Sequence, residues 1–185
     1  MNVKYSFLAL TFLMLSACGN DPVPKPRAML RLEYPPAQYE TYKKESNYQF
    51  IKNTKATITK EKNGAFNLEY PFMKATLFIT HKKVENNLDQ FFTDAQKLTY
   101  EHVIKADAIT EYPFVNPDDE VYGMLYGISG NAASQFQFYI TDSTQHFLTG
   151  SLYFYAKPNY DSILPAAAYM KKDIQKIMES LRWEK

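Results

Sequence analysis

Residues with catalytic or metal-binding potential are few in this chain and lie far apart. The three histidines are His81, His102 and His146, and none lies three or four residues from another histidine or from a cysteine, as a helical metal site requires. No Gly-x-Ser-x-Gly motif marks a serine nucleophile. We therefore expect a non-enzymatic protein with no metal, no cofactor and no small-molecule substrate, in which His102 packs from the apolar stripe of a helix.

The densest acidic cluster is Asp118-Asp119-Glu120, which follows the turn signal Asn116-Pro117. A solvated loop is the simplest interpretation. A calcium site needs more oxygen ligands at set spacings than this cluster supplies. The paired carboxylates of a cell-wall hydrolase stay an open alternative, because such partners can be distant in sequence.

Cys18 is the chemically most distinctive residue and the only cysteine, so it has no internal disulfide partner. It follows Lys4, an apolar run over residues 5–15 and the small pair Ser16-Ala17. This is the layout of a secretory signal peptide with cysteine at the cleavage point. It resembles the lipobox of bacterial lipoproteins, whose cysteine is diacylated and becomes the first mature residue. The run is shorter than the about 20 residues of a membrane span.

Residues 18–45 are predicted to form a lipid-anchored tether rich in proline, which favours extended backbone. Gly19 directly follows Cys18, which by the sorting rule of enteric bacteria indicates the outer membrane. Asp21 is the one acidic residue near the anchor, and this favours the periplasmic face. Anchoring in the cytoplasmic membrane is the alternative.

The second half of the tether alternates apolar and polar residues, with Leu30, Leu32 and Tyr34 around Arg31. Such a segment can dock as an edge strand on its own domain or on a partner, or remain a free linker.

A candidate partner surface follows from the aromatic stretch near residue 155. If Phe154 points inward, Tyr153 and Tyr155 point away from the helices, and together with Tyr160 they form an aromatic patch. The complete predicted partner surface is Arg31, Tyr34, Tyr153, Tyr155, Asn159 and Tyr160. Ordinary cross-strand packing is the competing interpretation.

Two short motifs, Asp142-Ser143-Thr144 and Asp161-Ser162-Ile163, fit an O-glycosylation pattern of exported Bacteroidota proteins. Ser143 and Ser162 are therefore candidate acceptors. A hairpin turn and a helix cap explain the same residues.

Hydrophobic periodicity predicts the order strands, helix, strands, helix. The strands include residues 48–51, 56–59, 65–70, 75–80 and 108–112, followed by 121–129, 132–141 and 146–156. The first helix runs from Leu88 to about Lys105. The second has Pro165 in its first turn and a stripe from Met170 to Leu181. A turn-rich stretch is predicted from Pro113 to Glu120.

These elements predict one globular α+β domain over residues 46–185, after a signal peptide over 1–17. The architecture is an antiparallel sheet with two helices packed on one face, a layout similar to the PsbP/Mog1-like fold. Aromatic residues make up 16% of the chain, enough for a core, and the net charge of +1 gives no reason to expect a nucleic acid partner.

The chain resembles the GldD-type gliding-motility lipoproteins of Bacteroidota. The resemblance lies in the lipobox, in Pro24-Lys25-Pro26-Arg27 and residues 30–35, in residues 150–155 and 158–162, and in Glu179-Ser-Leu-Arg-Trp183. It implies a component needed for gliding that works beside other lipoproteins of the motility and type IX secretion apparatus, with a membrane anchor through Cys18. A periplasmic lipid- or glycan-binding lipoprotein is the alternative function.

Overall fold

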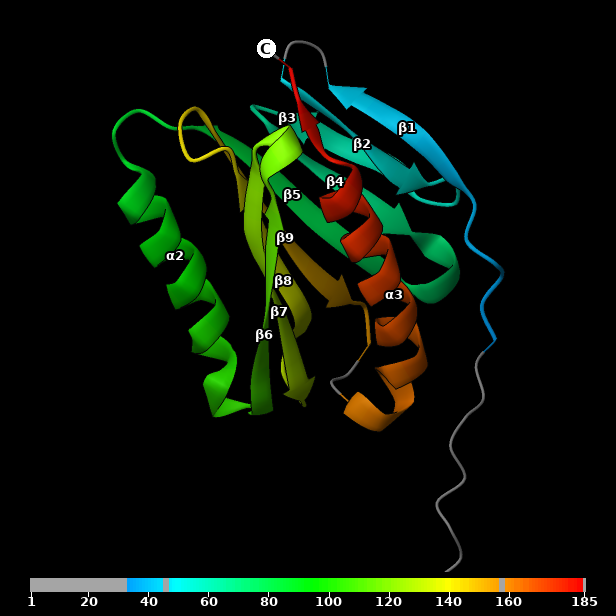
Figure 1. Cartoon of the computed structure of the whole chain (residues 1–185). Helices are drawn as coiled ribbons and strands as arrows, with labels where there is room; N and C mark the ends of the chain where they lie inside the picture. Colours follow the sequence, from blue (N-terminus) through cyan, green and yellow to red (C-terminus); the bar gives the residue numbers. More distant parts are fainter. Residues whose placement is uncertain (1–32, 45–46, 157–158, 185) are drawn as a thin grey trace, which may run out of the picture.

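The computed structural model describes residues 33–44, 47–156 and 159–184 (Figure 1). Two antiparallel sheets and two α-helices make up this part of the chain, which confirms the predicted α+β class. Cys18 and Arg31 lie outside the described residues.

A seven-stranded antiparallel sheet forms the centre of the fold. Its strands lie in the order β3 (Thr57–Lys62), β4 (Ala65–Tyr70), β5 (Ala75–Lys83), β9 (His146–Phe154), β8 (Ser134–Thr141), β7 (Val121–Gly130) and β6 (Ala106–Asn116). The β3–β4 turn is Asn63-Gly64, with φ of 49° and 80°, the left-handed backbone that a tight hairpin requires. Strand β6 lies at one edge of this sheet.

A smaller sheet of three strands contains β1 (Tyr39–Lys44), β2 (Tyr48–Asn53) and β10 (Arg182–Trp183). Strand β1 lies inside the segment predicted as tether, and it pairs with β2 along its whole length. Tyr42 explains this, because its ring packs 5.1 Å from Phe50 and 5.3 Å from Phe66. The folded part of the chain thus includes residues before 46.

The helices α2 (Leu88–Tyr100) and α3 (Tyr160–Ser180) lie on opposite faces of the large sheet (Figure 1). Helix α3 joins the core with Leu148 and Leu152 of β9, whereas Phe91 of α2 packs against Phe147, which points the other way. The expectation that both helices cover one face is therefore wrong in this detail. The central strands bury side chains on both faces, so each face needs its own cover.

Two further elements differ from expectation. Strand β6 continues through Pro113 to Asn116, where a turn was expected; an edge strand tolerates proline because one side of it has no ladder. Helix α3 begins at Tyr160, so Pro165 lies inside the helix and not in its first turn. Among the described residues, no helix is both long enough and apolar enough to cross a membrane.

Candidate functional site

An open groove runs between helix α3 and strands β6 and β7. It exists because α3 packs mainly over β2 and β8 and leaves part of β6 and of the neighbouring end of β7 less covered on the same face. The groove has a volume of about 230 Å³, and the residues that characterise it are Tyr112, Gly127, Phe136, Tyr160, Leu164 and Lys171. It is smaller than the roughly 300–1,000 Å³ of typical small-molecule sites.

A cation and an aromatic ring meet in the wall of this groove. The Nζ of Lys171 lies 3.8 Å from the centre of the Tyr112 ring, within the range of a cation–π interaction. The ring has room because residue 127 is glycine, where a Cβ would lie 3.2 Å from Cε2 of Tyr112 and 3.4 Å from Cε1 of Phe136. Tyr112 remains 37% exposed, so the pair is open to a ligand.

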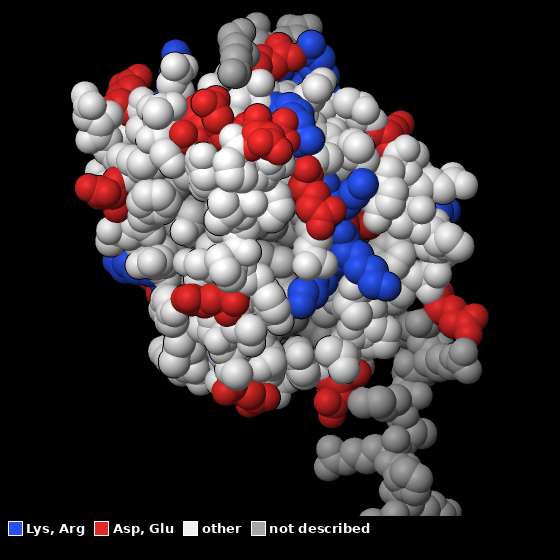
Figure 2. All heavy atoms as spheres, in the orientation of Figure 1, with Lys and Arg blue, Asp and Glu red and all other residues white. Residues whose placement is uncertain are grey.

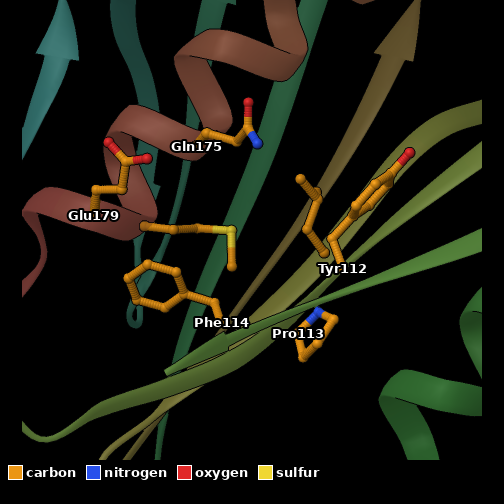
Figure 3. Close-up of a pocket in the computed structure, with 7 residues that line it drawn as sticks. Tyr112, Pro113, Phe114, Gln175 and Glu179 are labelled. Atoms are coloured by element: carbon orange, nitrogen blue, oxygen red, sulfur yellow. The ribbon is translucent and has the colours of Figure 1, made fainter. Parts of the chain in front are cut away.

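A smaller pocket of about 70 Å³ continues the groove toward the end of α3. Tyr112 lines both cavities, which makes them one surface. In the smaller pocket Tyr112, Pro113 and Phe114 come from β6, and Gln175 and Glu179 come from α3, as Figure 3 shows. Met178 and Leu125 complete its apolar floor.

The charges of the groove are arranged along its length. Helix α3 carries Lys171, Lys172 and Lys176, and Figure 2 shows basic side chains grouped over α3 with acidic side chains around them. Lys171 forms none of the salt bridges found among the described residues. Glu179 stands at the other end. The groove therefore offers apolar surface, a cation at one end and a carboxylate at the other, an arrangement suited to binding.

The opposite flank of α3 is closed by the residues that precede β1. Tyr34 packs 5.6 Å from Tyr169 of α3 and 6.3 Å from Phe72, measured between ring centres. Tyr34 was predicted as a partner-surface residue, and the structure places it against its own domain. Arg31, Leu30 and Leu32 lie outside the described residues.

Beneath Tyr34 lies a buried polar cluster centred on Asp173, which is 2% exposed. The Tyr39 hydroxyl donates to its Oδ1 over 2.9 Å, and Nδ2 of Asn53 donates to its Oδ2 over 2.8 Å. Burial raises the pKa of Asp173, against the lowering effect of these hydrogen bonds. Burial, and then the neighbouring Asp173 carboxylate, also raises the pKa of Tyr39. The cluster joins β1, β2 and α3.

The remaining predicted aromatic patch does not form one surface. Tyr153 packs edge-on against Phe78 at 5.6 Å, on the face that α2 covers. Tyr155 is 64% exposed, and its hydroxyl lies 3.3 Å from that of Thr76. Tyr160 instead lines the groove beside α3, and the exposed Asn159 precedes that helix as its N-cap.

One contact between two histidines was not predicted from the sequence, because the two residues are 65 positions apart. His81 Nε2 lies 3.0 Å from His146 Nδ1, and His146 stacks on Trp183 with ring centres 4.9 Å apart. Burial lowers the pKa of His81 to about 4, with a further lowering from His146. Burial also lowers the pKa of His146. Only the strand pairing β5–β9 brings these residues together.

The other candidate residues form contacts within the fold or lie in exposed turns. Asp119 pairs with Arg182 over 2.7 Å beside the short 3₁₀ helix η4 (Pro117–Asp119). His102 lies in the 3₁₀ turn η3 (Glu101–Ile104) that follows α2, partly buried, with its Nε2 2.9 Å from Nε2 of Gln137. Ser143 is exposed in a turn, and Ser162 donates to the Asn159 carbonyl from the exposed start of α3. Their glycosylation stays a prediction.

Among the described residues, no group of three or more histidine, cysteine, aspartate or glutamate side chains is placed to hold a metal ion. A family model described as gliding motility lipoprotein GldD matches residues 19–183. No curated protein matches the chain.

Proposed function

This chain belongs to the family of gliding motility lipoproteins GldD, and from that membership we propose that it is a non-enzymatic scaffold or accessory component of the gliding and type IX secretion machinery. A lipoprotein family implies an envelope protein held at a membrane by its lipid. The family match across residues 19–183 carries the proposal, because it includes the residues next to Cys18 as well as the folded domain.

The chain is suited to hold a folded domain at a limited distance from a membrane. Cys18 is the proposed lipid attachment point, in the periplasmic face of the outer membrane. About fifteen residues separate it from Glu33, and at ~3.3 Å per residue they reach at most about 50 Å. Tyr34 and Tyr39 then attach the chain to α3. The domain therefore works within about 50 Å of the membrane surface, beside other lipoproteins of the machinery.

The groove supports a binding role over a catalytic one. Its walls bring one cation, Lys171, and one carboxylate, Glu179, to opposite ends of an apolar surface. A glycosidase instead needs two carboxylates facing one bond. The volume of about 230 Å³ is small for a lipid chain or an oligosaccharide, which argues against the alternative of a lipid- or glycan-binding lipoprotein.

Gene deletion with matched complementation tests this function. We expect the deletion strain to lose colony spreading, and the wild-type gene to restore it. A gene with Cys18→Ala should not restore spreading, because its product carries no lipid; lipid labelling and membrane fractionation would confirm that loss. A deletion strain that spreads and secretes normally would contradict the proposal.

A further inference from the structure

The outer edge of β6 has no strand beside it among the described residues, since β6 ends the order of the large sheet. Pro113 shows which backbone groups face outward. Proline has no N–H to give to a ladder, so its nitrogen must face away from β7. Backbone direction alternates along a strand. The amides and carbonyls of Ile109, Glu111 and Val115 therefore face outward as well, while the Ala108 carbonyl accepts from the Ser129 hydroxyl on the β7 side.

The side chains of β6 point alternately to the two faces of the sheet. Tyr112 and Phe114 line the groove, as does Thr110, and alternate residues in a strand are about 7 Å apart. An extended segment laid along the outer edge of β6 would present its own alternate side chains at the same spacing. Its groove-facing side chains would lie beside Thr110, Tyr112 and Phe114, at the outer rim of the groove.

The charges give such a segment a preferred chemistry. Lys171 stands over Tyr112 and forms no salt bridge within the described part of the chain. An acidic side chain beside it would complete a charge pair at the groove wall. Glu179 at the far end disfavours a second acidic residue there.

We propose that the outer rim of the groove between β6 and α3 binds an extended segment of a partner protein, which pairs with the outer edge of β6, places alternate apolar side chains beside Tyr112 and Phe114, and sets an acidic side chain against Lys171. This is strand addition beside a helix, a recurrent mode of peptide recognition. It rests on the proposed function in one respect: the partner is another protein of the same envelope machinery.

Two other occupants compete with the proposed partner for this edge, and crosslinking in cells separates the three. A photo-crosslinking amino acid replaces Thr110, which is exposed on β6 and lines the groove, in the full-length lipoprotein, and the control replaces Phe78, which lies on the α2 face. The proposal expects a product at position 110, in which mass spectrometry identifies an apolar-alternating segment with an acidic residue. A product with residues 1–32 of the same chain, a product with a second copy, or no product would overturn it.

A charge exchange then tests the assigned contact, because capture alone identifies only the segment. A synthetic peptide of that segment is titrated against the mature protein by calorimetry. Lys171→Glu should weaken binding about tenfold, and changing the acidic peptide residue to lysine should restore it. Lys172→Glu, next along the helix and exposed, is the matched control and should bind like wild type. Failure of the exchange to restore binding would overturn the assignment.

Backbone methylation of the peptide tests strand pairing with the wild-type protein alone. Two peptides are compared, each methylated at every second backbone amide. In one peptide the methyl groups replace the N–H donors that face β6, and in the other peptide those donors are spared. We expect binding to fall at least about tenfold for one register only. Equal binding by both peptides would overturn strand addition. A deletion strain that fails to glide would still support the proposed function, so the two proposals can fail separately.

Discussion

The two flanks of helix α3 differ in nearly every respect. On one flank, Tyr169 and Asp173 are covered by β1, β2 and the residues before them, and the buried carboxylate is hydrogen-bonded from two sides. On the other flank, Lys171 and Gln175 face an open groove above β6 and β7. One helix thus attaches the membrane-proximal segment on its closed flank and leaves a shaped, charged surface on its open flank.

This difference indicates how the domain can be both anchored and available. A tether that attached over β6 would cover the exposed strand edge that borders the groove. Because Tyr34 and Tyr39 hold the chain on the far side of α3, the described residues that precede β1 leave the groove uncovered. The closed flank should therefore control stability, and the open flank should control partner binding.

The largest expected effect on stability comes from removing the buried carboxylate on the closed flank. Asp173→Ala leaves the Asn53 amide and the Tyr39 hydroxyl without their acceptor, and a loss of about 3 kcal/mol in the free energy of unfolding is expected. Gln175→Ala, half a turn further along on the open flank, should cost less than about 0.5 kcal/mol. Urea denaturation of both variants measures the difference. Equal losses would remove the distinction between the flanks.

A somewhat smaller effect is expected from acid. The pKa of His81 is lowered in the folded state to about 4, so between about pH 6.5 and pH 4 the unfolded chain binds the additional proton and stability falls as pH falls. His146, Asp142, Lys44 and Lys83 also act on this histidine. His81→Gln should flatten that part of the profile, as measured by the urea midpoint against pH. An unchanged slope would show that other groups carry the acid sensitivity.

Tyr39→Phe should have a more moderate effect, because it removes one hydrogen bond to a buried carboxylate and keeps the ring. A loss of about 1.5 kcal/mol is expected. The loss should be accompanied by faster proteolysis near residues 33–38, since β1 then holds to α3 less tightly. Tyr153→Phe, on the opposite face, is the control and should leave the cleavage rate as in wild type. Equal acceleration in both variants would count against a local role of Tyr39.

The smallest effect on stability belongs to the open flank. Lys171→Ala loses an exposed cation–π contact, worth about 0.5 kcal/mol, and thermal unfolding should hardly shift. Its effect should instead appear in partner binding. A large loss of stability would mean that Lys171 supports the fold and is not poised for a ligand.

Local patterns in the sequence predicted much of this architecture. The change from alternation to helical spacing predicted the start of α2 at Leu88, and Asn63-Gly64 predicted a hairpin, both as observed. The apolar stripe of a helix, however, says which side is buried and not which sheet face receives it. Because β9 buries both Phe147 and Leu148, on opposite faces, either face can take a helix, and the prediction of one shared face was wrong.

The groove was harder to predict, because it forms where α3 and the strands β6 and β7 do not pack closely against each other. The sequence marked Tyr160, but it grouped this residue with Tyr153 and Tyr155, which lie on the other face. Lys171 and Tyr112 meet only because α3 is displaced toward β2, and no spacing in the chain reports that displacement. The Asp173 cluster and the histidine pair likewise join residues more than sixty positions apart.

The most direct test of the account compares two lysines one residue apart on α3. A gene-deletion strain is complemented with wild type, Lys171→Glu or Lys172→Glu, and colony spreading is measured at equal levels of membrane-bound protein. We predict that Lys172→Glu restores spreading and that Lys171→Glu does not, although both proteins are folded and anchored. Full spreading with Lys171→Glu would contradict the claim that the open flank of α3 is the working surface.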